Sequence, residues 1–212
     1  MPDVDVLLPL LSIAMVAAYH VFLAMRVRAR PDYTMQSFLS KSRAAWIERI
    51  MTDKEGILGV QTLRNTIMGA TFFASTAVAL IVGTITLSTQ GDRLSQVWAS
   101  TAAVGSIDQH LWFIKIVALL VDLMCAFVFF SQSVRLNAHV GVLIGVPAAH
   151  LSPRVVARLF IRAGRYHTWG MRCYYLATPM VFWLFGPIPL FVSAIALVAA
   201  LYFLDRSPLR AE

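Results

Sequence analysis

Two polar residues inside long apolar runs could carry a proton or an ion. Asp122 lies eleven positions after Leu111, about 17 Å along a helix at 1.5 Å per residue. An aspartate near the middle of a membrane is costly, so it should face protein or water, be protonated or have a partner. His20 lies roughly 8 Å from the inner end of another apolar run. The pair would be either a titratable step in a proton or ion path or a neutral cluster that fixes helix register.

A second polar cluster stands at the start of the second apolar run. Gln61 is one helical turn from both Arg64 and Asn65, so the three share a helix face. Amide and guanidinium groups together could bind a phosphate, a carboxylate or a lipid headgroup. The alternative is a helix end whose polar side chains satisfy orphan backbone donors.

The sequence indicates no catalytic residue, metal site or cofactor. The five histidines stand at different depths, so no two of them offer matched haem ligands. Cys125 and Cys173 lie in apolar context without a CxxC motif. Walker, Rossmann, HExxH and GxSxG motifs are absent from the sequence.

The composition is that of an integral membrane protein. Of 212 residues, 58% are apolar and only 14% are charged, where soluble domains have about 25% charged residues. Mean hydropathy is +0.70. We expect an all-α fold and a single membrane domain over residues 1–212, a four-transmembrane helical bundle with spans at about 6–25, 65–87, 111–134 and 174–204.

The charges predict how the bundle is oriented. Residues 26–64 and 135–172 hold 14 of the 18 Lys and Arg residues, so the positive-inside rule places both connections in the cytoplasm and both termini outside. The net charge of +7 therefore serves orientation and lipid contact, and we expect no nucleic-acid partner. The expected location is a bacterial cytoplasmic (inner) membrane.

The fourth apolar run, 174–204, is too long for one upright span and too short for two. Its 31 residues would reach about 46 Å as a helix. Gly186, Pro187 and Pro189 lie near its middle and predict a helix break. We expect one long, kinked helix, and the alternative is a re-entrant hairpin.

The cytoplasmic connections contain two amphipathic patterns. Residues at about 35–51 repeat apolar positions every three or four residues, with Lys41, Arg43 and Glu48 between them. A second pattern at about 153–168 starts after Ser152, a favourable N-cap, and bears arginines and no acid. We expect two interfacial helices against membrane lipids that are anionic on the cytoplasmic side.

Small residues recur at every fourth position of the second span. Thr71, Ser75, Ala79 and Gly83 form one stripe. Such stripes let helices approach closely. The stripe favours a compact bundle, a homo-oligomer or a partner membrane subunit.

Several separated motifs resemble an uncharacterised multi-pass membrane-protein family, domain of unknown function 599, found in bacteria and plants. The resemblance covers nearly the whole chain and implies a multi-pass membrane protein, with no established activity or site. It rests on Pro31 and Thr34 with Arg43 and Trp46; on Val60, Gln61, Thr62, Leu63, Arg64 and Asn65; on Gly170, Arg172, Tyr175 and Pro179; on Trp183, Phe185, Gly186 and Pro187; and on Leu201, Tyr202 and Asp205.

These features favour a non-enzymatic membrane protein that associates with itself or serves as an accessory or scaffold subunit. The alternative is a small oligomeric transporter or channel that uses Asp122 and His20, with the broken helix supplying free backbone groups. An enzyme acting on inner-leaflet lipid would use Arg64, Asn65 and His139 or His167, but no nucleophile is paired with a base at a recognisable spacing.

Overall fold

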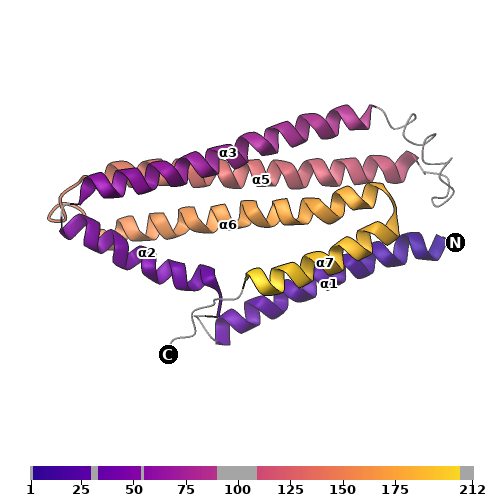
Figure 1. The fold of residues 1–212 in the computed structure, drawn as a ribbon, viewed down its shortest axis with the longest axis horizontal. Helices are drawn as coiled ribbons and strands as arrows, with labels where there is room; N and C mark the ends of the chain where they lie inside the picture. The colour runs from indigo at the N-terminus through magenta and orange to yellow at the C-terminus, as the bar shows by residue number, and fades with distance from the viewer. Residues whose placement is uncertain (1, 30–32, 54, 90–108, 206–212) are drawn as a thin grey trace. The chain divides into compact units, whose positions relative to one another are not determined.

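A computed structural model describes residues 2–29, 33–53, 55–89 and 109–205. These residues form six α-helices and no β-strand, which confirms the all-α prediction (Figure 1). The helices are α1 (Pro2–Ala29), α2 (Met35–Thr52), α3 (Gly56–Ser88), α5 (Gln109–Leu143), α6 (Pro153–Leu184) and α7 (Pro187–Leu204).

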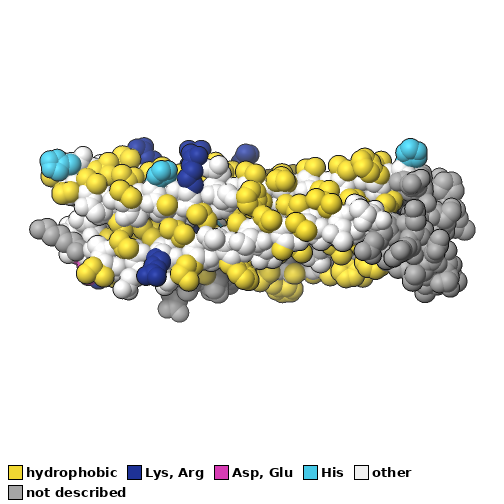
Figure 2. Space-filling view, turned by 90° about the horizontal axis from the view of Figure 1, so that it is seen from above, with side chains coloured by type: hydrophobic (Ala, Val, Ile, Leu, Met, Phe, Trp, Pro, Cys, Tyr) yellow, Lys and Arg dark blue, Asp and Glu magenta, His cyan; other side chains and the backbone are white. Residues whose placement is uncertain are grey.

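Four of these helices are long and apolar enough to cross a membrane, as the sequence predicted. The candidate spans are Val6–Ala29, Gly56–Ser88, His110–Leu143 and Pro187–Leu204. The second starts earlier and the third ends later than predicted, because neither stretch contains a helix-breaking residue at the predicted boundary. On the face shown in Figure 2, hydrophobic side chains cover much of the surface, and the Lys and Arg side chains gather toward one side of the view.

The chain divides into two compact units. One comprises Met1–Met25, Ala77–Cys125 and Arg172–Leu204, and the other Arg26–Thr76, Ala126–Met171 and Asp205–Glu212. We call them the Asp122 unit and the Arg43 unit. Helices α1, α3, α5 and α6 contribute residues to both. The single domain over residues 1–212 stays a prediction.

The core of the Arg43 unit holds helix α2 against α3, α5 and α6. Its buried side chains come from all four helices and the turn after α5: Ile47, Ile50, Met51, Leu63, Val140, Ile144, Val156, Ala157 and Phe160. Burial of each of the larger side chains in this set contributes on the order of 2 kcal/mol. This packing fixes which face of α2 points inward.

Both ends of α2 agree with the sequence prediction to within a residue or two. Thr34 is the N-cap, and its hydroxyl oxygen accepts a hydrogen bond from the Ser37 backbone N–H at 3.3 Å. At the other end, the Asp53 N–H donates to the Arg49 carbonyl at 2.8 Å. A side-chain bond from the Thr168 hydroxyl to Gln36 Oε1, 2.9 Å long, ties the first turn of α2 to α6.

The expected interfacial helix at 153–168 is the first half of a longer helix. It begins at Pro153, next to the predicted N-cap Ser152, but it continues to Leu184. No breaker separates the arginine-rich part from the apolar part, so the change in composition at about residue 170 does not end the helix.

The run at 174–204 is two helices instead of one kinked helix. Helix α6 ends at Leu184, α7 begins at Pro187, and Gly186 between them has φ of +135°, a conformation that L side chains rarely adopt. Residues on both sides of this turn, such as Met180 and Leu190, line one cavity, so the chain reverses there and α7 runs back beside α6 (Figure 1). The predicted helix break is therefore confirmed, and α6 and α7 form a helical hairpin at this break.

The reversal changes where the chain ends. The Met35 N–H donates to the Asp205 carbonyl at 3.4 Å, so the residue after α7 lies beside the start of α2. We expected the chain after the fourth apolar run to lie on the opposite side of the membrane from residues 26–64. For Asp205 this expectation is therefore wrong. It failed because it counted the run at 174–204 as a single crossing. Met1 and residues 206–212 themselves lie outside the described residues.

Candidate functional site

A cavity of about 420 Å³ lies in the Arg43 unit, where four helices meet. Cavities that hold small ligands are usually about 300–1,000 Å³. Its polar lining is Arg43, Asn65, Thr66, Ser133, Asn137 and His167. The remaining lining residues are Gly69, Phe73, Phe160 and Gly164. We call it the Arg43 cavity.

Arg43 lies on the inward face of α2. It is four residues before Ile47 and seven before Ile50, both of which are almost fully buried, and this spacing places all three on one helix face. The guanidinium carbon is 5.5 Å from the centre of the Phe160 ring, within cation–π range. A β-carbon at Gly164 would overlap the guanidinium, so the absence of a side chain there makes room for it.

The charge of Arg43 is not neutralised by the protein. Its Nη1 is buried without a hydrogen-bond partner, and the structure gives it no carboxylate neighbour among the described residues. The two acids that follow the end of α2, Asp53 and Glu55, both pair with Arg49 instead. Burial lowers the pKa of the Arg43 guanidinium, although arginine keeps its proton at neutral pH.

His167 is the second titratable group of the cavity. Its ring meets the rings of Phe73 and Phe130 edge-on, at centroid distances of 5.9 and 5.4 Å, and Nδ1 is buried without a partner. Burial and, second, the charge of Arg43 lower the pKa of His167 below its ordinary value. At neutral pH we therefore expect an uncharged imidazole.

Asn137 contributes a buried acceptor. It is 1% exposed, and its Nδ2 donates to the Ser133 carbonyl at 2.9 Å. Because a carbonyl can only accept, this bond fixes the orientation of the amide. Oδ1 is then left buried with no donor, a state that costs about 1–3 kcal/mol unless something fills it.

The rim of the cavity is on α3. Asn65 and Gly69 are exposed, whereas Ser133, Asn137 and Gly164 are buried. The side chains that flank the rim, Met68 and Phe72, are 61% and 69% exposed. The cavity thus opens on the apolar surface of a candidate membrane span.

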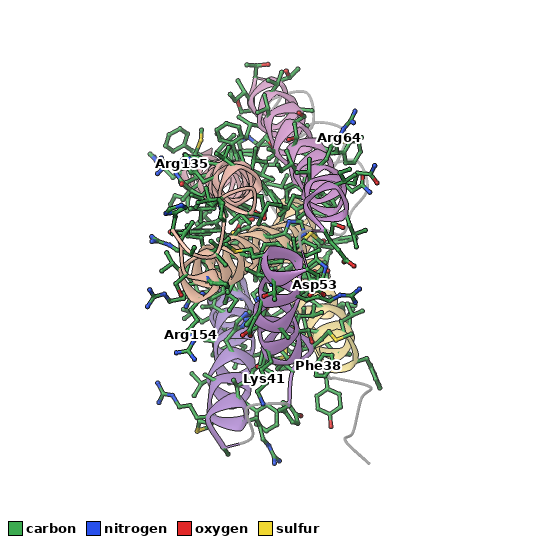
Figure 3. The ribbon with its side chains drawn as sticks, turned by 90° about the vertical axis from the view of Figure 1, so that its left-hand side faces the viewer. Phe38, Lys41, Asp53, Arg64, Arg135 and Arg154 are labelled. Carbon is green, nitrogen blue, oxygen red and sulfur yellow. The ribbon has the colours of Figure 1, made fainter. Side chains whose placement is uncertain are left out.

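The structure separates the three residues of the predicted anion or lipid cluster. Asn65 lines the Arg43 cavity, but Gln61 lines a different one, of about 560 Å³, beside Gly145. Arg64 is exposed and points outward, as do Arg135 and Arg154 on other helices (Figure 3). The alternative of a helix end is wrong, because α3 begins at Gly56 and all three residues lie within the helix.

His20 and Asp122, the predicted intramembrane pair, have separate surroundings. His20 Nδ1 donates to the Val16 carbonyl at 2.8 Å, and the ring lines a mainly apolar cavity of about 400 Å³ between α1, α6 and α7. Asp122 is hydrogen-bonded to the Cys173 thiol, while its Oδ2 is buried without a partner. No hydrogen bond joins His20 to Asp122 in the described part of the Asp122 unit.

Reasoning from sequence did not place Arg43 or Asn137 in a site, and it named His167 beside Asn65 only for the alternative of a lipid enzyme. The signal for Arg43 was its helical spacing to Ile47 and Ile50. This spacing is present in the sequence, but we assigned Arg43 to the polar face of the helix. Asn137 gives no such signal, because its orphan oxygen depends on how α5 packs. Across the residues that the structure describes, no group of three His, Cys, Asp or Glu side chains is placed to hold a metal.

The chain belongs to the family described as protein of unknown function, DUF599, whose model matches residues 6–208. No curated protein and no solved structure matches the chain. Arg43 and Asn65, which carried the resemblance, are thus both residues of the Arg43 cavity.

Proposed function

We propose that this member of the DUF599 family is a non-enzymatic, multi-pass integral membrane protein of the cytoplasmic membrane that binds an anion in the Arg43 cavity. The observation that carries the proposal is the partly buried guanidinium of Arg43, which lines a cavity, has no acidic partner among the described residues and has one donor, Nη1, that is buried without an acceptor. A buried charge without a partner is strongly unfavourable. A bound anion would remove this cost.

The distribution of charge supports binding on the cytoplasmic side. Arg43 belongs to the connection 26–64, and His167 belongs to 135–172, the two regions that hold 14 of 18 cations. By the positive-inside rule these regions face the cytoplasm. The four apolar helices support a membrane location.

A binding role is favoured over catalysis by the kinds of side chain around the cavity. The lining offers donors, acceptors and aromatic faces, but no cysteine, carboxylate or lysine. Thr66 and Ser133 are the hydroxyl groups, and Ser133 Oγ is engaged by Asn137 at 3.4 Å. No activated nucleophile with a base is therefore in place.

The test is thermal unfolding of the purified protein with and without added anions. Phosphate should raise the midpoint of the wild type, because a ligand that binds only the folded state stabilises it. Arg43→Gln should abolish the rise, whereas Arg49→Gln, a change at an exposed arginine of the same helix, should leave it intact. Equal responses of the two variants would refute the proposal.

Self-association is a second candidate role, favoured by the small-residue stripe on α3. Thr71, Ser75, Ala79 and Gly83 are all exposed, and a β-carbon at Gly83 would meet nothing within 4 Å. The stripe is thus free for a second copy or a partner subunit. Ala79→Leu should lower the fraction of dimer in mild detergent, and a wild type that is monomeric at all concentrations would refute this role.

The alternative of a proton or ion path through His20 and Asp122 has less support, since no hydrogen bond connects the two residues. A path would need a further carrier between them. Proton flux into liposomes that is lost in Asp122→Asn would revive this alternative.

A further inference from the structure

The Arg43 cavity requires more of its ligand than negative charge. Arg43 Nη1 is a donor without an acceptor, and Asn137 Oδ1 is an acceptor without a donor. A ligand that satisfies both must carry an anionic oxygen and an O–H or N–H group. This inference rests on the proposed anion binding and narrows the class of anion.

Common anions differ in whether they can supply that donor. A simple carboxylate, a sulfate or a phosphate diester has only acceptor oxygens at neutral pH. A phosphate monoester has a second pKa of about 6, so its singly protonated form, which has a P–OH group, is accessible near neutral pH. The P–OH would donate to Asn137 Oδ1 while the other oxygens accept from Arg43.

The rest of the cavity suits the same group. The Nδ1 atom of His167 has no hydrogen-bond partner, and it can donate to a phosphate oxygen when it carries the ring proton. Asn65 at the rim adds an amide. Burial and, second, the positive charge of Arg43 lower the pKa of His167, so the ring stays uncharged while the cavity is empty.

The surroundings of the rim indicate where the phosphate comes from. Met68 and Phe72 are exposed on both sides of Gly69, on a helix that is long and apolar enough to cross a membrane. A soluble phosphate compound would have to pass this apolar surface. A lipid would place its acyl chains against Met68 and Phe72 and its headgroup at the cavity.

We propose that the Arg43 cavity binds a phosphate monoester group carried by a membrane lipid, with Arg43 holding an anionic oxygen and Asn137 Oδ1 accepting the P–OH proton. Phosphatidic acid is the simplest lipid with this headgroup. In this proposal Asn137 discriminates between phosphate monoesters and diesters, because only a monoester has a P–OH group. Arg43 binds both classes.

The experiment measures lipid binding to the full chain by native mass spectrometry from nanodiscs. The nanodiscs contain phosphatidylcholine with a small fraction of phosphatidic acid or of phosphatidylmethanol, a diester with no P–OH. We expect wild type to retain phosphatidic acid over phosphatidylmethanol by roughly threefold to tenfold, the range for one neutral hydrogen bond. Asn137→Leu should bring that ratio close to one, and Arg49→Gln should leave it unchanged.

The outcomes separate the inference from the proposed function. Equal retention of both lipids by the wild type would overturn the monoester inference, whatever Asn137→Leu does, and would leave anion binding standing. Equal retention by wild type and Arg43→Gln would overturn both. If glycerol 3-phosphate displaced phosphatidic acid at equal concentration, the inference that the ligand is a lipid would be refuted. The inference that the ligand is a phosphate monoester would stand.

Discussion

The guanidinium of Arg43 lies against the backbone of Gly164, where any β-carbon would overlap it. The contact joins α2 to α6 at the wall of the cavity. Glycine at this position is therefore a condition for the placement of the charge, independent of any anion.

Gly164→Ala should displace the guanidinium and weaken anion binding by about tenfold, the effect of losing one charge-assisted hydrogen bond. The overlapping atoms are the far end of a flexible side chain, so the unfolding temperature should change by only a few degrees. Anion titration and thermal unfolding measure the two effects. A variant that binds as the wild type does would show that Arg43 does not need this position.

Gly170→Ala should act on stability instead. Its β-carbon would lie 2.9 Å from three atoms of the Phe130 ring, which is fully buried and stacked on Phe73 at 5.3 Å. The ring cannot move without disturbing its neighbours, so overpacking should cost about 1–3 kcal/mol. Gly69→Ala is the matched control, because nothing lies within 4 Å of that β-carbon. A loss of stability in Gly69→Ala as large as in Gly170→Ala would contradict the packing argument.

His167 should make the folded protein less stable in mild acid. Burial and the charge of Arg43 lower its pKa in the folded state, while an unfolded histidine has a pKa of about 6.5. As the pH falls below that value, the unfolded chain binds the proton first, so stability is lost as the pH falls.

Between pH 8 and 5, the unfolding midpoint of the wild type should fall by about 2–4 °C more than that of His167→Gln. Arg43, on α2, is the charged group next to His167 at the cavity; α3 and α5 contribute only uncharged side chains there. Parallel pH profiles for the two proteins would mean that His167 does not titrate differently in the folded state.

The end of α7 should lie on the same side of the membrane as the connection between α2 and α3. Asp205 accepts a hydrogen bond from Met35, and this holds whether the α6–α7 hairpin crosses the membrane fully or folds back within it. An epitope after Glu212 and one inserted between Asp53 and Glu55 should both be cleaved by protease in inverted vesicles and protected in right-side-out vesicles. Opposite protection of the two epitopes would contradict the hairpin.

The helices were predictable where a local signal defined them. Ser152 and Pro153 marked the start of α6 as an N-cap and a first-turn residue. The start of α2 was predicted from its apolar pattern, and the structure adds the N-cap Thr34. Gly186, Pro187 and Pro189 marked the break between α6 and α7. The boundary that we placed at Tyr174 was wrong, because it came from hydropathy, which reports on solvent and not on helix geometry. The positive φ of Gly186 became evident only in the structure.

Among the cavity residues, His167 was named only for the lipid-enzyme alternative, and Asn65 was predicted as part of an anion site. Its predicted partners, Gln61 and Arg64, share its helix but turn to other surroundings, since neighbours along one helix do not determine contacts between helices. The partners it has, Arg43 and His167, come from sequence positions far away on α2 and α6. Sequence spacing identifies a face, whereas the site depends on which faces meet.

The most direct test of anion binding in the Arg43 cavity is native mass spectrometry of the protein extracted from its own membrane. The wild type and Arg49→Gln should both retain an anionic molecule that contains a phosphate monoester, and Arg43→Gln, if folded to the same unfolding temperature, should lack it. Retention of the same molecule by Arg43→Gln, or no retained anion on the wild type, would contradict the assignment of this cavity as a binding site.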